Sequence, residues 1–238
     1  MAWNLNSFAN NDELSDQLCH DIAEQLRSKI ANDALASLVV SGGSTPELLF
    51  TKLSQQPLDW SKVVVTLADE RWLPAAHADA NASLVEHSLL QNQAAQAKFV
   101  SLTEAAESPF GAEADVNQRL TTLLAWPLST VVLGMGNDGH TASLFPGAAT
   151  LNNALSGFNS AGEKSLCCAL NPPTADYQRM TLTAPALLNC QNLILYIRGK
   201  KKLEVLEKAI QLGPIEALPI RAFLHQDCVT MQIYYSEQ

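Results

Sequence analysis

Hydrophobic residues recur along this chain at two spacings, one typical of helices and one typical of buried strands. In residues 12–30, leucine and isoleucine return every four positions, which predicts an amphipathic helix with one face in the core. Residues 38–40 and 63–67 are instead short continuous runs of Leu, Val and Thr, ended by polar or glycine residues. Such runs are typical of strands that are buried on both faces.

The same two patterns continue to the C-terminus. Strands are expected at residues 99–100, 130–133, 165–170, 180–183, 193–197 and 229–234, and helices at 81–91, 111–125 and 200–212. A further helix is expected to begin with Thr45 as its N-cap and Pro46 in its first turn. Strands that alternate with helices predict an α/β fold with a mostly parallel sheet flanked by helices. No repeat or linker divides the chain, so we expect a single domain over residues 1–238.

The composition narrows the class of ligand. Hydrophobic residues make up 47% of the 238 residues and charged residues 16%, as in ordinary globular enzymes. With 15 Lys and Arg against 24 Asp and Glu, the net charge of −9 argues against binding to nucleic acid or to an anionic membrane. A small anionic ligand, which needs only two or three local cations, is compatible with this charge. No apolar run approaches the ~20 residues of a membrane span, and the first residues predict no signal peptide.

The cysteines and histidines show no metal-binding or disulfide pattern. The five cysteines are odd in number and include no Cys-x-x-Cys pair, which favours a reducing, cytoplasmic setting. The histidines lack the spacing of metal ligands, so no metal site is expected.

One glycine-rich loop, residues 134–147, stands out for its chemistry. It follows the strand expected at 130–133 and matches Gly-x-Gly-x-x-Gly, but Pro146 leaves no room for the long helix of a dinucleotide site. His140 lies in this polar loop, where an imidazole can exchange protons near neutral pH. The alternative is a histidine that only holds the loop together. Asp138 could orient the ring or bind a substrate hydroxyl.

Two further polar segments follow predicted strands. Residues 41–46, Ser-Gly-Gly-Ser-Thr-Pro, suit a phosphate because free amides and a helix N-terminus favour negative charge, but a plain strand-to-helix turn fits equally well. Residues 69–71, Asp-Glu-Arg, would form local salt bridges or present Arg71 to an oxyanion. Ligands of open parallel sheets bind at the carboxyl ends of the strands. We therefore expect residues 41–46, 69–71 and 134–140 to share one rim.

Together these segments resemble the signatures of the 6-phosphogluconolactonase family. The resemblance rests on residues 41–46, residues 69–74 and, most specifically, residues 134–147, and it spans nearly the whole chain. It implies a modified Rossmann-like fold shared with glucosamine-6-phosphate deaminases and ribose-5-phosphate isomerase. It also implies hydrolysis of 6-phosphoglucono-δ-lactone in the oxidative pentose phosphate pathway.

Two positions separate this chain from the related deaminases. The deaminase pattern carries Asn-Glu-Pro after its histidine, whereas this chain has the acid-free run Ser143-Leu144-Phe145-Pro146. The deaminases also tend to have an aromatic residue where Arg71 stands. In one departure, the family often has Ser-Asn after the acidic segment, and this chain has Ala80-Asn81. The alternatives are a glucosamine-6-phosphate deaminase/isomerase and a sugar-phosphate-binding module without catalysis.

The resemblance also implies roles for individual residues. His140 is the base that takes a proton from water, Arg71 steadies the developing oxyanion, and Asp138 is a further catalytic candidate. Arg179 holds the phosphate or a sugar hydroxyl, and Asp69 is a further candidate for substrate contact. The phosphate cradle consists of Gly42, Gly43, Ser44 and Thr45, with Lys202 as its cation.

The same resemblance implies neither a metal nor an organic cofactor. The expected partner is the sugar-phosphate lactone alone, and the expected assembly is a monomer or a weak homo-oligomer. Lys200, Lys201 and Lys202 open the same predicted helix, where positive charge opposes the helix dipole. This placement suggests that one of them meets an anion, and the resemblance favours Lys202.

Overall fold

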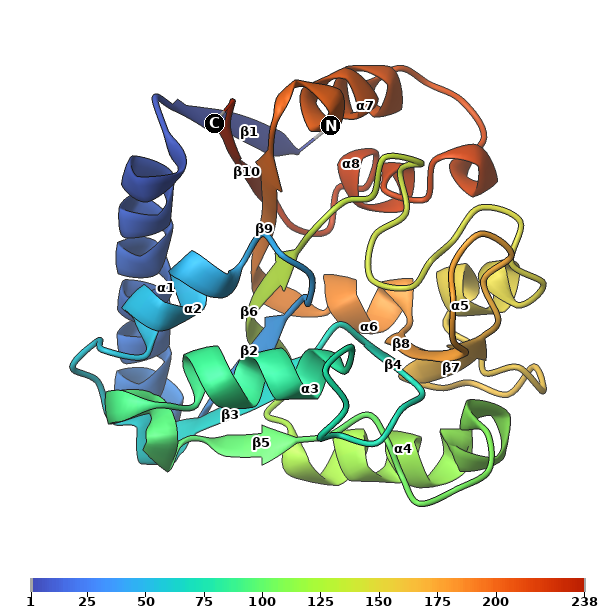
Figure 1. Cartoon of the computed structure of the whole chain (residues 1–238), viewed down its shortest axis with the longest axis horizontal. Coiled ribbons are helices and arrows are strands. Elements are labelled where there is room, and N and C mark those ends of the chain that lie inside the picture. The colour runs from blue at the N-terminus through green and yellow to red at the C-terminus, as the bar shows by residue number, and fades with distance from the viewer. Residues whose placement is uncertain (1, 238) are drawn as a thin grey trace.

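A sheet of seven parallel strands forms the centre of the protein, in the order β1-β10-β9-β6-β2-β3-β5 (Figure 1). The structure is a computed structural model that describes residues 2–237. Its strands are β1 (Trp3–Phe8), β2 (Ala36–Val40), β3 (Val63–Leu67), β5 (Lys98–Val100), β6 (Leu128–Leu133), β9 (Cys190–Arg198) and β10 (Met231–Ser236). Every residue of β2, β3 and β6 is buried, as expected for parallel strands covered on both faces.

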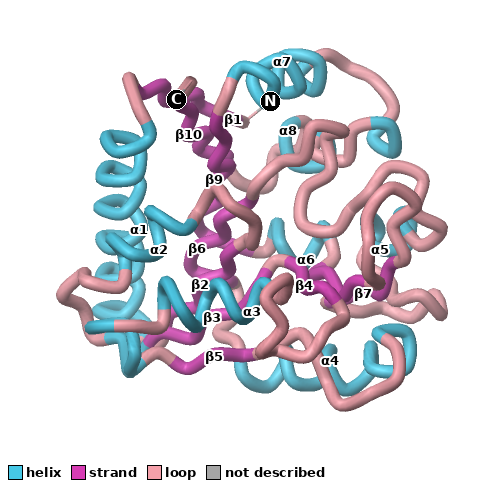
Figure 2. Tube along the Cα trace, viewed as in Figure 1, coloured by secondary structure: helices cyan, strands magenta, loops and turns pink. Residues whose placement is uncertain are grey.

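Helices cover both faces of this sheet. In Figure 2 the sheet is seen nearly edge-on, with α1 and α2 on one side and α6 and α8 on the other. The helices are α1 (Asn11–Asp33), α2 (Glu47–Leu53), α3 (Asn81–Leu84), α4 (Pro109–Leu123), α5 (Leu151–Ser156), α6 (Ala184–Leu188), α7 (Lys200–Ile210) and α8 (Arg221–Leu224). The predicted α/β fold with a mostly parallel sheet is therefore confirmed. No helix within residues 2–237 is long and apolar enough to cross a membrane.

A second, antiparallel sheet lies beside the first, in the order β4-β8-β7. It consists of β4 (Asp69–Arg71), β8 (Arg179–Leu182) and β7 (Cys167–Leu170). The polar segment 69–71, which was expected to be a loop after its strand, is itself a strand, because β4 pairs with β8 as soon as the chain leaves β3. This pairing sets Arg71 directly opposite Arg179, two residues that are far apart in the sequence.

Most predicted elements are found within a few residues of their expected bounds. Asn10 caps α1 by accepting from the backbone N–H groups of Asp12 and Glu13. The expected Thr45 cap is wrong by one residue: Pro46 occupies the N-cap position, its carbonyl accepting from Phe50 N, and α2 begins at Glu47. The strand β1 was not predicted, because it is an edge strand whose residues are mostly polar or partly exposed.

The predicted helix over residues 81–91 is only partly regular. It begins as α3 and continues as one π-helical turn, η2 (Val85–Leu89). Three short 3₁₀ turns complete the fold: η1 (Trp60–Lys62), η3 (Asn92–Gln96) and η4 (Ile215–Ala217).

Candidate active site

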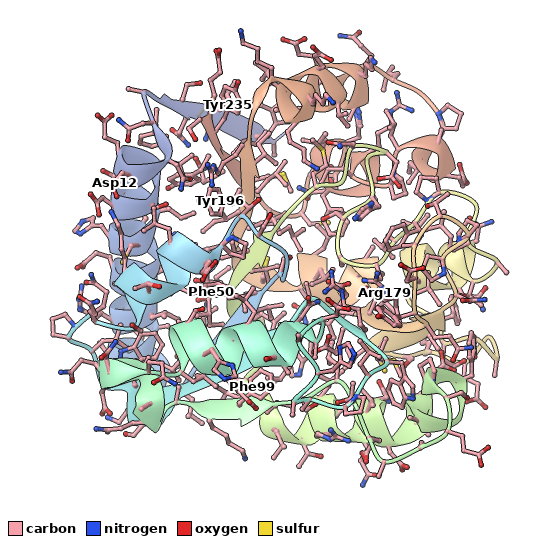
Figure 3. All side chains as sticks on the ribbon, viewed as in Figure 1. Asp12, Phe50, Phe99, Arg179, Tyr196 and Tyr235 are labelled. Carbon is pink, nitrogen blue, oxygen red and sulfur yellow. The ribbon has the colours of Figure 1, made fainter. Side chains whose placement is uncertain are left out.

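A cleft of about 440 Å³ opens at the carboxyl ends of the parallel strands. The three predicted segments meet there, so the expectation of a shared rim is confirmed. Figure 3 labels Phe50, Arg179 and Tyr196, which are among the residues of its wall. The predicted residues that line it are Gly42, Gly43, Ser44, Thr45, Asp69, Arg71, His140, Arg179 and Lys202. Asp138 does not line this cleft but lines an adjoining cavity that shares Arg71, His140 and Arg179 with it.

His140 is held by two neighbours from its own loop. Its Nδ1 lies 2.5 Å from Asp138 Oδ1, and its ring stacks on Phe145 with centroids 4.1 Å apart. Burial raises the pKa of Asp138, but the hydrogen bond and charge of His140 outweigh it, so the pKa is lower than usual. When a carboxylate accepts from Nδ1–H, Nε2 carries the lone pair and can act as a base. The loop thus presents an oriented imidazole to the cleft.

The glycines of this loop make room for the ring of His140 and allow the turn that carries it. A Cβ on Gly136 would lie 2.1 Å from His140 Nδ1, so only glycine lets the ring sit where it does. Gly139 has a φ of +74°, in the left-handed region that favours glycine. Its carbonyl accepts from Ile220 N at 2.9 Å, which ties the loop to the chain before α8. Thr141 Oγ1 donates to Gly134 O at 2.8 Å and closes the turn.

Arg179 lines the cleft and the adjoining cavity together with His140. Its guanidinium carbon lies 5.5 Å from the centroid of the same Phe145 ring that stacks on His140. Its Nη1 lies 3.7 Å from Asp69 Oδ2, and both side chains are buried. Burial lowers the pKa of Arg179 and the Asp69 charge raises it, although a guanidinium stays protonated in either case.

Asp69 offsets the cost of placing two arginines opposite each other across β4 and β8. Its carboxylate is fixed by a short hydrogen bond from Ser143 Oγ, a buried hydroxyl on the histidine loop. Arg71 Nη1 donates to Asp79 O at 2.5 Å. The Nε atoms of both arginines are buried and lack a hydrogen-bond partner among the described residues.

Glu70, which the sequence left without an assigned role, supports the frame of the site. Its carboxylate accepts from the backbone N–H groups of Arg71, Asn81 and Ala82, and the side chain is buried. Glu70 therefore ties β4 to the start of α3. Burial raises the pKa of Glu70 to about 7, against the lowering effect of these three donors.

This raised pKa predicts a pH-dependent stability. Between the ordinary pKa of 4.5 and the folded value of about 7, the folded state holds more protons than the unfolded state. The contribution of Glu70 is therefore present below about pH 4.5 and is lost as the pH rises through about 7. We expect Glu70→Gln to remove up to about 3 kcal/mol of the pH-dependent change in the free energy of unfolding. Urea unfolding at a series of pH values measures this change. Glu204→Gln, at an exposed position, is the control, and equal slopes in the parent and Glu70→Gln would contradict the assignment.

The segment Ser41–Pro46 offers free backbone donors. None of the amide N–H groups of residues 42–45 donates to another residue in the part of the chain that the structure describes. Gly43 has a φ of +93°, which requires a left-handed backbone. Gly42 is needed for a different reason, since a Cβ there would lie 2.0 Å from Asn81 Oδ1. The segment can therefore bind an anion through its backbone, as the phosphate interpretation requires.

The three lysines at the start of α7 have different surroundings. Lys200 is exposed and pairs with Glu237 at 3.0 Å, and Lys201 is exposed as well. Lys202 alone of the three lines the cleft, where its Nζ donates to Met135 O at 2.5 Å. Burial lowers the pKa of Lys202, and the charge of Asp138 partly restores it. Lys202 is thus the lysine that can meet an anion in the cleft.

Besides Glu70, four residues that build the site were not assigned a role from the sequence. Ser143 and Phe145 were considered only because the run that contains them lacks an acid. Asn81 was considered only as a family departure and a helix start, yet it is buried and donates to Asp69 O at 2.9 Å. Arg198 could have been found, because it ends a predicted strand at the same edge of the sheet. No group of three or more metal-binding side chains occurs within residues 2–237.

Comparisons with known proteins agree on one family. A family model described as glucosamine-6-phosphate isomerases/6-phosphogluconolactonase matches residues 9–231. A 6-phosphogluconolactonase of Rhizobium meliloti is 42% identical over 236 residues, covering 99% of this chain and all of the relative. The crystal structure of a 6-phosphogluconolactonase from Shewanella baltica superposes with a TM-score of 0.93 at 41% identity, covering 98% of this chain and 97% of the other.

The fold extends to more distant relatives. A monomeric glucosamine-6-phosphate deaminase shares it with a TM-score of 0.78 at 18% identity, covering 98% of each chain. At this identity the likeness concerns the fold alone. The two activities therefore have to be separated at the level of the site.

Proposed function

The chain belongs to the glucosamine-6-phosphate isomerase/6-phosphogluconolactonase family, and we propose that it hydrolyses 6-phospho-D-glucono-1,5-lactone to 6-phospho-D-gluconate in the oxidative pentose phosphate pathway. The observation that carries this proposal is the base His140, oriented by Asp138 and set beside the guanidinium of Arg179 in one cleft. A lactone needs this combination: a base for water and positive charge for the carbonyl oxygen.

The proposed reaction uses His140 twice. Nε2 takes a proton from water while the water oxygen bonds to the lactone carbonyl carbon, and the carbonyl oxygen becomes an oxyanion. The guanidinium groups of Arg71 and Arg179, which both line the cleft, stabilise that charge. The intermediate then breaks its bond to the ring oxygen, which accepts the proton from Nε2. The ring opens to the free acid, which releases its proton to solvent.

The surroundings of His140 favour the lactonase over the deaminase. Phe145 and Leu144 occupy the run where the deaminase pattern places its glutamate, and Phe145 packs its ring against the imidazole. An apolar ring there leaves this side of His140 without the second carboxylate of the deaminase pattern. Water activation by a single oriented base needs no such carboxylate.

The phosphate is proposed to bind at the other end of the cleft. The backbone donors of residues 42–45 and the ammonium of Lys202 form a cradle for it. Binding the phosphate away from the carbonyl holds the ring in position for attack. The resemblance assigned Arg179 to the phosphate or a sugar hydroxyl. We propose the carbonyl instead, because its guanidinium carbon lies 5.5 Å from the centroid of the Phe145 ring that stacks on His140.

A coupled assay tests the activity. Glucose-6-phosphate dehydrogenase generates the lactone, and its disappearance is compared with spontaneous hydrolysis. We expect a clear acceleration that depends on the protein. Ammonia release from glucosamine 6-phosphate would instead support the deaminase, and phosphosugar binding without acceleration would support a binding module.

Lys202→Ala is expected to raise KM about 10-fold or more, because a charge-assisted contact to the phosphate is lost. The value of kcat should stay close to that of the parent, since this contact is equally present in the ground and transition states. Steady-state kinetics measure both constants. Lys201→Ala, exposed and outside the cleft, is the matched control. An unchanged KM in Lys202→Ala would remove Lys202 from the phosphate site.

The remaining expectations about the chain also stand as proposals. One contiguous cluster of buried side chains extends from Leu14 to Tyr235, which supports a single domain. The buried free thiols of Cys19, Cys167 and Cys168 suit a reducing compartment and support a cytoplasmic location. A monomer or a weak homo-oligomer is proposed as the assembly, and the reaction scheme requires only the side chains above and water.

A further inference from the structure

We propose that Arg198 is a second cation for the substrate phosphate, and that it makes the cleft selective for doubly charged sugar phosphates over uncharged sugar lactones. This inference rests on the proposed function, because it names the residue that completes the phosphate end of the same cleft. Arg198 lies outside the three segments described above, which are the glycine-rich loop, the Ser41–Pro46 segment and the three lysines 200–202. Its assignment comes from its position, its lack of partners and the charge of the ligand.

The position of Arg198 follows from its strand. Arg198 is the last residue of β9, and Tyr196, two residues earlier, points to the same face of the sheet. This is the face that α1 covers, because Tyr196 Oη donates to Asn11 Oδ1, at the start of α1, at 2.6 Å. Since α2 packs against α1, the segment Ser41–Pro46 that leads into α2 lies on this same face. Arg198 therefore projects from the sheet edge on the side of the phosphate cradle.

The wall of the cleft agrees with this placement. Arg198, Tyr196 and Phe50 of α2 all line it, together with residues 41–46. Figure 3 labels Phe50 and Tyr196, which mark this part of the wall between α2 and β9. Arg71 and Arg179 come from the second sheet instead, and both line the adjoining cavity together with His140. The four cations of the cleft thus fall into two pairs, one from β9 and α7 and one from the second sheet.

Arg198 is available to a ligand. It is exposed, and it makes no side-chain hydrogen bond or ion pair with any residue in the described range 2–237. The neighbouring lysines each have one partner: Lys200 pairs with Glu237, and Lys202 donates to Met135 O and keeps its other donors. A guanidinium without a partner retains its full charge and all five donors for a phosphate.

The charge of the ligand calls for a second cation. A phosphate monoester carries about −1.5 to −2 at pH 7, which one ammonium cannot balance. Four cationic side chains line the cleft, against one carboxylate, Asp69, which pairs with Arg179. In a chain with a net charge of −9, this excess of positive charge is local to the cleft. Lys202 and Arg198 together match a phosphate dianion, and the arginine fork adds bidentate contacts.

Arg198→Gln tests the inference by direct binding and by kinetics. Calorimetry with 6-phosphogluconate should show a Kd raised about 10- to 100-fold, as expected for the loss of a charge-assisted hydrogen bond. In the coupled assay KM should rise by a similar factor while kcat stays within about threefold of the parent. Lys208→Gln removes the same charge from an exposed position of α7 outside the cleft and should change neither constant. Arg198→Lys should restore part of the affinity.

Two readouts separate a phosphate contact from a structural role. The penalty of Arg198→Gln should shrink between about pH 8 and about pH 5, because the phosphate loses its second charge near pH 6. Gluconate, which lacks the phosphate, should bind the parent and the variant equally. An unchanged Kd for 6-phosphogluconate, or equal losses for both ligands, would overturn the inference. If the parent binds 6-phosphogluconate but does not accelerate lactone hydrolysis, the proposed function fails while the binding test of Arg198 still stands.

Discussion

His140→Ala is expected to lower kcat for the phospholactone by about 10²- to 10⁴-fold, the range in which a positioned general base contributes. The ring that is removed is the one that Asp138 orients and Phe145 supports, and no other imidazole lines the cleft. Most of the rest of the cleft wall comes from other segments, so KM should change much less than kcat. Single-turnover and steady-state kinetics measure the two constants separately.

Added imidazole sharpens this test. Because the alanine variant leaves space beside Phe145, free imidazole should restore part of the lost rate in a concentration-dependent manner. The affinity for 6-phosphogluconate, measured by calorimetry, serves as the control for an intact cleft. Near-normal turnover by His140→Ala would contradict the role of His140 as the base and would favour a histidine that only stabilises its loop.

Gly136→Ala is expected to lower kcat by about 10²-fold although it replaces no group that reacts, because displacing a catalytic group by about 1 Å carries a cost of this size. The added Cβ would lie 2.1 Å from His140 Nδ1 and 2.5 Å from Asp138 Oδ1. Both atoms belong to side chains that can move, so the pair should shift while the backbone stays in place. We therefore expect a large loss of activity with little change in the melting temperature.

The comparison with a neutral glycine isolates this effect. Gly111→Ala lies in α4, where an added Cβ would meet nothing within 4 Å, and it should keep full activity. In Gly136→Ala the ¹H–¹⁵N spectrum of the imidazole should report an altered hydrogen bond at Nδ1. Full activity with an unchanged imidazole spectrum would show that the pair tolerates the Cβ and that its geometry is not critical.

The sequence alone predicts most of the fold and the edge of the sheet at which the candidate site lies. Four-residue hydrophobic spacing predicts α1, and continuous apolar runs predict β2, β3 and β6, because burial of one helix face or of both strand faces leaves a local periodic signature. The polar segments after these strands could be placed on one rim, since parallel strands end at one edge of the sheet. His140 was found because an imidazole between glycine and threonine has little apolar surface to bury against.

The arrangement of the charged side chains in the cleft follows only from the tertiary structure. Nothing local shows that Arg71 faces Arg179, because their register depends on an antiparallel pairing between segments more than a hundred residues apart. Only packing reveals that Asp69, held by Ser143, pairs with Arg179, and that Phe145 supports His140. Packing also decides that Lys202 rather than Lys200 or Lys201 lines the cleft. Hydrophobic periodicity records which residues are buried, but the partner of a buried charge is set by the meeting of distant segments.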